Sequence, residues 1–70
     1  MTAAEAQALI DEASLPLARA GRQVVFTARR TTRAYTITMT VDSREHASGT
    51  GRDEMRAMDA LANALRRSAA

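Results

Sequence analysis

The sequence lacks several residue types, and each absence excludes a class of site or protein. It has no cysteine and only one histidine, which excludes disulfides and thiolate ligands and leaves no second histidine to complete a metal site. No apolar run approaches the roughly 20 residues that a membrane-spanning helix needs. The first 13 residues hold three acids and no basic residue, whereas a signal peptide begins with positive charge. We therefore expect a soluble, cytoplasmic protein that does not contact a membrane.

The chain has 70 residues, which is enough for one small domain, expected to span residues 1–70. A chain of this size buries only about 60% of the surface that it exposes when unfolded. We therefore expect modest stability, or stability that is helped by a partner or by pairing into a homodimer.

All ten basic residues are arginines, and they are unevenly distributed. Residues 13–41 contain five arginines and no acid, whereas the rest of the chain contains five arginines and eight acids. A basic middle between acidic ends predicts one face that attracts phosphate or carboxylate. The exclusive use of arginine has two explanations: a high-GC coding sequence, or bidentate recognition of an anionic partner, which a guanidinium performs better than an ammonium.

Residues 3–14 are predicted to form a helix. Thr2 is placed to cap it, and Glu5 three residues later completes a capping box. The apolar positions that share one face of this helix are Ala6, Leu9, Ile10 and Ala13. We expect Pro16 to end the helix, because the residue before a proline disfavours helical geometry.

Two strands are predicted over residues 22–30 and 34–42. In the second, the alternation of Tyr35, Ile37, Met39 and Val41 with three threonines is typical of a strand with one face in the core. In the first, Val24, Phe26 and Ala28 share a face. The two strands are expected to form an antiparallel hairpin that turns at about Thr31 and Thr32. The threonine face is interpreted as the wet side of the sheet, with a dimer surface or an edge strand extended by a partner as alternatives.

The remaining segment is predicted to contain a turn at Asp42 to Arg44, a weak third strand over residues 45–49, and a second helix capped by Asp53. The apolar stripe of this helix comprises Met55, Met58, Leu61, Ala62 and Leu65. Met55 and Met58 are expected to lie in the core, and the alternative is an exposed, adaptable patch for protein contact. Gly49-Thr50-Gly51 is interpreted as a turn that needs glycine dihedrals rather than as a phosphate-binding loop. The expected fold class is therefore α+β, in the order α-β-β-(β)-α, with two helices packed on one face of a small antiparallel sheet.

Residues 34–65 resemble the second half of a double-stranded-RNA-binding domain. In AYTITMTVDSREHASGTG an alternating strand leads through a turn to a third strand and a Gly-x-Gly. The helix that follows is similar to the alanine-rich second helix of that family, with Ala57, Ala60, Ala62, Ala64 and Leu65. The resemblance implies α-β-β-β-α order and duplex RNA as a ligand, although a shared fold is a weak guide to function.

The resemblance also implies three places of contact with RNA: the polar face of the first helix, the loop between the first two strands, and a lysine cluster that starts the second helix. The lysine positions correspond here to Glu54, Met55 and Met58, and carboxylates at this place oppose phosphate binding. The loop over residues 29–33 lacks the family's Gly-Pro-x-His pattern but is strongly basic. The polar face of the first helix carries Glu5, Gln7, Asp11 and Glu12.

The candidate binding residues for a partner or a nucleic acid are Arg29, Arg30, Arg33, Arg52 and Arg56. Three arginines within five residues can make charge-assisted bonds to a phosphate backbone or an acidic protein surface, and the plain alternative is a solvated turn. We expect no catalytic residue, cofactor or metal site. His46 with Asp42, Ser43 and Ser48 does not form a triad, because these residues crowd one turn and cannot converge on one reacting atom.

The sequence leads to two functional hypotheses. The favoured one is a non-catalytic interaction protein that docks onto a protein or nucleoprotein partner. An inhibitor of the anti-CRISPR type, encoded by a bacterial phage or mobile element, is one example of such a protein. The alternative is a genuine duplex RNA- or DNA-binding protein that uses arginines in place of the missing lysines.

Overall fold

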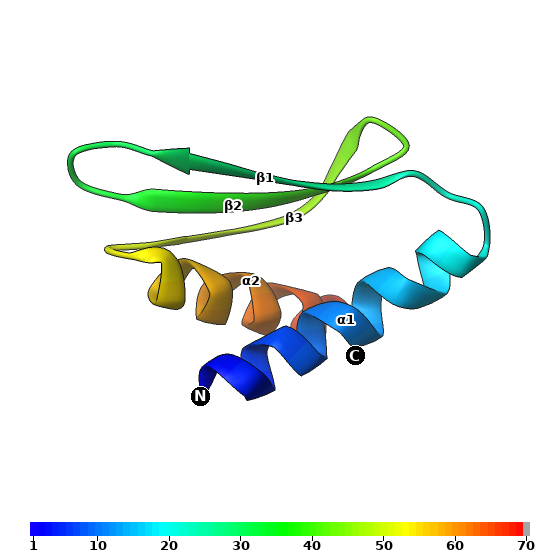
Figure 1. Cartoon of the computed structure of the whole chain (residues 1–70), viewed down its shortest axis with the longest axis horizontal. Coiled ribbons are helices and arrows are strands. Elements are labelled where there is room, and N and C mark those ends of the chain that lie inside the picture. Colours follow the sequence, from blue (N-terminus) through cyan, green and yellow to red (C-terminus); the bar gives the residue numbers. More distant parts are fainter. Residues whose placement is uncertain (70) are drawn as a thin grey trace.

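The computed structural model describes residues 1–69, which form a helix, three strands and a second helix (Figure 1). The elements are α1 (Ala3–Arg19), β1 (Val24–Arg30), β2 (Tyr35–Val41), β3 (Arg44–Gly51) and α2 (Glu54–Ala69). The α+β class and the order of elements are as predicted, and the third strand, predicted over residues 45–49, is a strand of eight residues. The single domain expected over residues 1–70 includes Ala70, which lies outside the described residues. No helix within residues 1–69 has the length and apolar character needed to cross a membrane.

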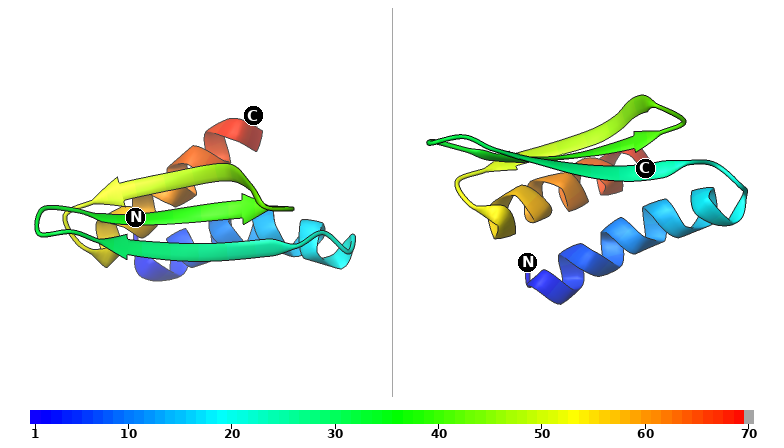
Figure 2. Two further views of the ribbon diagram at one scale, coloured as in Figure 1. Left: turned by 90° about the horizontal axis from the view of Figure 1, so that it is seen from above. Right: turned by 45° about the horizontal axis from the view of Figure 1, so that its top comes forward.

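The three strands form one antiparallel sheet in the order β1-β2-β3, and both helices lie on the same face of it (Figure 2). Residues directly opposite each other in an antiparallel pair share a face. Because Phe26 pairs with Met39 and Met39 with Ala47, these three side chains face the helices. The register shifts once, between Met39 and Thr40 on the β2–β3 side.

The core lies between the two helices and the middle of the sheet. Its buried members are Ala6, Ile10, Met39, Val41, Leu61, Ala62 and Leu65. Met58 packs against this cluster, as predicted for a core residue. The same prediction for Met55 is wrong, since its side chain is 45% exposed. Met55 lies in the first turn of α2, where every residue before Ala57 is exposed because the other elements do not cover it.

The start of α1 is closed by the predicted capping box. The Thr2 hydroxyl accepts a hydrogen bond from the Glu5 backbone N–H at 3.1 Å, and the Glu5 carboxylate accepts one from the Thr2 backbone N–H at 3.3 Å. These two bonds satisfy two of the free N–H groups at the beginning of the helix.

The prediction that Pro16 ends this helix is wrong, because α1 continues through it to Arg19. The added turn is closed by a Schellman motif, in which the Gly21 N–H donates to Ala18 O at 3.0 Å and the Arg22 N–H to Leu17 O at 3.1 Å. Gly21 has a φ of +82°, the left-handed geometry that this motif requires. Leu17 also packs against the core. These interactions together outweigh the single helical hydrogen bond that a proline cannot donate.

The glycines of the Gly-x-Gly motif serve close packing rather than a turn. Gly49 and Gly51 both lie in β3, and neither has a positive φ. A Cβ on Gly49 would overlap the backbone N of Leu61 and the backbone O of Ala57. The interpretation of this motif as a turn that needs glycine dihedrals is therefore wrong. Glycine is needed because the backbone of β3 lies directly on the backbone of α2.

Candidate partner-binding end of the molecule

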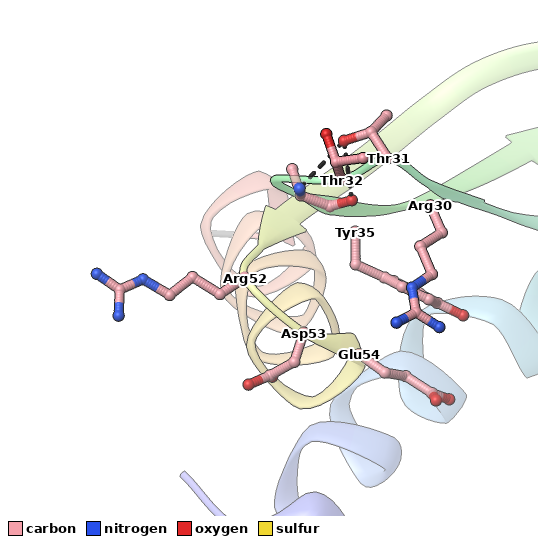
Figure 3. Close-up of a pocket in the computed structure, with 8 residues that line it drawn as sticks. Arg30, Thr31, Thr32, Tyr35, Arg52, Asp53 and Glu54 are labelled. Carbon is pink, nitrogen blue, oxygen red and sulfur yellow. Dashed lines mark hydrogen bonds between the residues drawn. The ribbon is translucent and has the colours of Figure 1, made fainter.

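Two loops that are distant in the sequence meet at one end of the sheet. Arg30 pairs with Tyr35, and Tyr35 pairs with Gly51, so the β1–β2 loop and the β3–α2 connection leave the sheet at the same end (Figure 1). Between them lies a shallow pocket of about 290 Å³, which we call the tip pocket. It is lined by Arg30, Thr31, Thr32, Ala34, Tyr35, Arg52, Asp53 and Glu54 (Figure 3).

The β1–β2 loop is held closed by Thr31. Its backbone N–H donates to Ala34 O at 2.8 Å, and its hydroxyl oxygen accepts a hydrogen bond from the Ala34 N–H at 3.1 Å. The turn thus lies where the hairpin prediction placed it. One side chain therefore organises the loop that follows Arg30 and carries Arg33.

The arginines predicted as one basic tip point in different directions. Arg29 pairs with Thr36 and faces the side of the sheet away from the helices, whereas Arg30 pairs with Tyr35 on the helix side. Arg33 lies in the loop between the strands. Arg52, in the β3–α2 connection, extends outward, away from Arg30 (Figure 3). The structure thus places four predicted residues at one end of the molecule, spread around it rather than gathered in one patch.

The fifth predicted residue, Arg56, is engaged within the chain. Its Nη1 lies 2.8 Å from Asp53 Oδ2, and its backbone N–H donates to Asp53 Oδ1 at 2.9 Å. Asp53 is therefore the cap of α2, as predicted, and it also pairs with an arginine of the first turn. The only other ion pair within residues 1–69 joins Arg22 and Asp42.

The four remaining arginines therefore have no carboxylate partner within residues 1–69, and we call them the arginine end. They are Arg29, Arg30, Arg33 and Arg52. All four are exposed to solvent. Such guanidinium groups are available for bidentate hydrogen bonds to carboxylate or phosphate.

Two carboxylates lie among these arginines. Asp53 and Glu54 both line the tip pocket, and Glu54 lies on the side toward which Arg30 reaches (Figure 3). The hydrogen bond from the Arg56 backbone N–H, aided by the Arg56 side chain, lowers the pKa of Asp53. Asp53 is therefore ionised at neutral pH, and the surface around the tip pocket has mixed charge.

A second surface was not predicted from the sequence. A groove of about 210 Å³ opens between the two helices and the sheet, and we call it the β1 groove. It is lined by Gln7, Ile10, Phe26, Ile37, Met58 and Leu61. Phe26 is 44% exposed, although Met39 opposite it is fully buried. The N-terminal half of α1 diverges from β1 (Figure 1), and the alternation within a strand carries no signal for such a gap.

The turn between β2 and β3 consists of Asp42 and Ser43, whereas His46 and Ser48, expected in the same turn, lie in β3. Asp42 Oδ2 accepts a hydrogen bond from Arg22 Nε at 2.9 Å, and Oδ1 accepts one from the Gln23 N–H at 3.0 Å. Both bonds lower the pKa of Asp42, and the bond from the Gln23 N–H has the larger effect. Asp42 and Ser43 have φ values of 53° and 68°, which fit a tight hairpin turn. The part of the chain that the structure describes holds no group of three acids or histidines suited to a metal.

Comparison with known proteins identified no relative. No protein-family model matches the chain, and no curated protein or solved structure matches it either.

Proposed function

We propose that this chain is a non-catalytic interaction protein whose arginine end docks onto an acidic surface of a protein or nucleoprotein partner. The observation that carries this proposal is the set of four arginines without a carboxylate partner within residues 1–69, at the end of a small hairpin whose loop is closed by hydrogen bonds. Arginine is enriched where proteins bind each other, because its planar fork gives directional bonds and is weakly hydrated.

The two carboxylates beside these arginines favour a protein partner over a nucleic acid. A duplex presents phosphates along its whole backbone, and each acid in the contact area opposes binding. Asp53 and Glu54 lie in the tip pocket itself, and the pKa of Asp53 is lowered. A protein surface, which also carries mixed charge, can offer basic or neutral groups at the positions of these acids.

The wider biological setting of this proposal is a small accessory or inhibitory protein. One compact domain that binds through exposed arginines suits a protein that blocks a larger machine by occupying its surface. An inhibitor of the anti-CRISPR type, carried by a phage or mobile element, is the example that we put forward.

A duplex-binding function is the second candidate, and one observation favours it. The β1–β2 loop and the start of α2 leave the sheet at the same end, an arrangement that the resemblance to double-stranded-RNA-binding domains requires. In this proposal Arg30, Arg33 and Arg52 contact phosphates in place of the family's lysines. Arg56 contributes less, because Asp53 already holds it.

A mobility-shift titration with duplex RNA and duplex DNA at two salt concentrations separates the two candidates. For the docking function we expect no shift at micromolar protein. Tight binding with a steep salt dependence that is lost in the Arg30→Ala plus Arg33→Ala variant would establish the duplex-binding function instead.

The docking function is tested directly by comparing three baits in a pull-down from the native host after nuclease treatment. The baits are the wild-type chain, Arg30→Glu plus Arg33→Glu, and the matched control Arg66→Glu plus Arg67→Glu, which changes the same charge in the last turns of α2. We expect a partner that the wild type and the control retain and the first variant loses. Equal retention by all three baits would refute the arginine end as the docking surface.

A further inference from the structure

We propose that β1 is an acceptor for an added strand: an extended segment of the partner protein pairs with its free edge. The residues of that segment opposite Phe26 and Ala28 are apolar, and the end that lies at the β1–β2 loop is acidic. This inference rests on the proposed docking function and adds the chemistry and the binding mode of the partner.

The backbone groups that a new strand would need are free on β1. The Asp42 N–H donates to Gln23 O at 2.8 Å, and the Thr31 N–H donates to Ala34 O at 2.8 Å, so these residue pairs are hydrogen-bonded pairs of the hairpin. Such pairs alternate with non-bonded pairs along an antiparallel ladder. The backbone groups that point outward from the sheet are therefore those of Val24, Phe26, Ala28 and Arg30.

The two edge strands of the sheet differ in how well they are protected against pairing with another strand. At β3, the register shift and the charged residues Arg44 and Glu45 interrupt the edge, as edge strands commonly do to avoid pairing. β1 has an unbroken register over seven residues, with no proline and no acid. All of its residues after Val24 are exposed. From Val24 to Ala28 this edge carries no charge, and an uncharged, regular edge is a template for an added strand.

The β1 groove supplies a place for the side chains of the added strand. Residues opposite Phe26 and Ala28 project to the helix side, because directly paired residues share a face. They would lie beside the exposed ring of Phe26 and continue the apolar surface formed by Ile37 and Met58. Apolar side chains at these two positions would therefore remove the half-exposed Phe26 from water.

The arginines at one end of β1 indicate which kind of segment pairs with this strand. The C-terminal end of β1 carries Arg29 on one face and Arg30 on the other, and Arg33 follows in the loop. No acid occurs anywhere in residues 13–41. A second copy of β1, paired antiparallel, would place its own arginines at the opposite end of the strand and leave this group without further acids, whereas an acidic segment would neutralise it. In an antiparallel pairing, the N-terminal end of the segment lies at the β1–β2 loop and carries the acids.

The experiment uses a fluorescent eight-residue peptide, blocked at both ends, with three acidic residues followed by five in which valine and threonine alternate. Its affinity for the isotope-labelled chain is measured by fluorescence anisotropy, and its site by amide shift changes. We expect sub-millimolar binding, with the largest shifts on Phe26 and Ala28. A peptide with lysines in place of the acids should bind at least about tenfold more weakly.

Proline substitution tests the hydrogen-bonding mode. Ala28→Pro removes an outward-facing N–H without touching the β1–β2 ladder, and prolines are tolerated on edge strands. We expect this substitution to lower the affinity for the peptide at least about tenfold. Ser48→Pro is the matched control, because the same alternation makes the backbone of Ser48 point outward from β3. We expect this variant to bind as the wild type does.

A second measurement keeps the test valid if Ala28→Pro does not fold. The peptide is N-methylated either at the valines, which would bond to β1, or at the threonines, which would face away. Only methylation at the valines should abolish binding, and equal effects of the two would overturn strand addition.

The remaining outcomes separate this inference from the proposed function. Binding that is lost in Arg30→Glu plus Arg33→Glu but unchanged in Ala28→Pro would overturn strand addition and leave docking through the arginine end intact. Sedimentation that shows a dimer of the wild type, abolished by Ala28→Pro, would make a second copy the occupant and overturn the acidic segment. No binding of the peptide at about 1 mM would overturn the inference, and the pull-down above would still decide the docking function.

Discussion

Gly49 of β3 lies against the backbone nitrogen of Leu61 in α2, with no room for a side chain between them. This contact joins the end of the sheet to the helix that follows it. It therefore holds the backbone of β3 directly against the backbone of α2.

Replacing Gly49 by alanine should destabilise the protein severely. The added methyl group meets backbone atoms of Leu61 and Ala57, which cannot rotate away as a side chain can. We expect a loss of about 3 kcal/mol or more in the free energy of unfolding, at the upper end of overpacking effects. Unfolding in urea, monitored by circular dichroism, measures this loss in the free energy of unfolding.

The control for this substitution is Ser48→Ala in the same strand. Ser48 is exposed, and we expect a change within about 0.5 kcal/mol. A Gly49→Ala variant as stable as this control would contradict the close backbone packing of β3 on α2.

Replacing Asp59 by alanine should stabilise the protein. Asp59 Oδ1 is shielded from solvent and has no hydrogen-bond partner within residues 1–69. An unsatisfied polar atom of this kind costs free energy, and alanine is also a better helix former. We expect a gain of about 1 kcal/mol in the free energy of unfolding.

The exposed Glu12→Ala substitution in α1 gives a lower bound for the gain from helix propensity, because glutamate is a better helix former than aspartate. If Asp59→Ala raises the free energy of unfolding no more than Glu12→Ala does, the unsatisfied Asp59 Oδ1 does not destabilise the protein.

The free energy of unfolding should fall in acid. The pKa values of Asp42 and Asp53 are lowered from their ordinary value of 3.8, mainly by backbone hydrogen bonds from Gln23 and Arg56 respectively. A lowered pKa in the folded state means that the unfolded state binds more protons. The stabilisation is therefore complete above about pH 5 and is lost as the pH falls through the folded pKa values.

Urea titrations at a series of pH values between neutrality and acid measure this dependence. In the Asp42→Asn plus Asp53→Asn variant the free energy of unfolding should depend less on pH, since neither position can then gain a proton. Asparagine also tolerates the positive φ of position 42 and can cap a helix. An unchanged curve in this variant would assign the acid sensitivity to other groups.

The features that could be predicted from the sequence are those with local causes. The Thr2–Glu5 capping box and the Asp53 cap depend on residues three apart, and both occur as predicted. The alternation of Tyr35 to Val41 identifies β2 because one strand face must enter the core. These signals together were sufficient for the fold class.

The features that could not be predicted depend on how elements pack. Pro16 is a local signal for a helix end, but the Schellman motif and the packing of Leu17 outweigh it. Gly49 is a packing residue only because α2 lies on it. For the candidate site, the sequence predicted one basic tip, whereas the register of β1 places Arg29 and Arg30 on opposite faces of the sheet.

The cross-strand pair of Phe26 and Met39 should respond unequally to truncation. Both side chains face the helices from directly opposite positions, yet Met39 is fully buried and Phe26 is 44% exposed. Met39→Ala leaves a cavity in the core and should cost about 2–5 kcal/mol. Phe26→Ala removes a ring that is already partly in water, and we expect a cost below about 1.5 kcal/mol. Urea titration of both variants measures the difference, and equal costs would mean that α1 covers β1 in solution and that the β1 groove is closed.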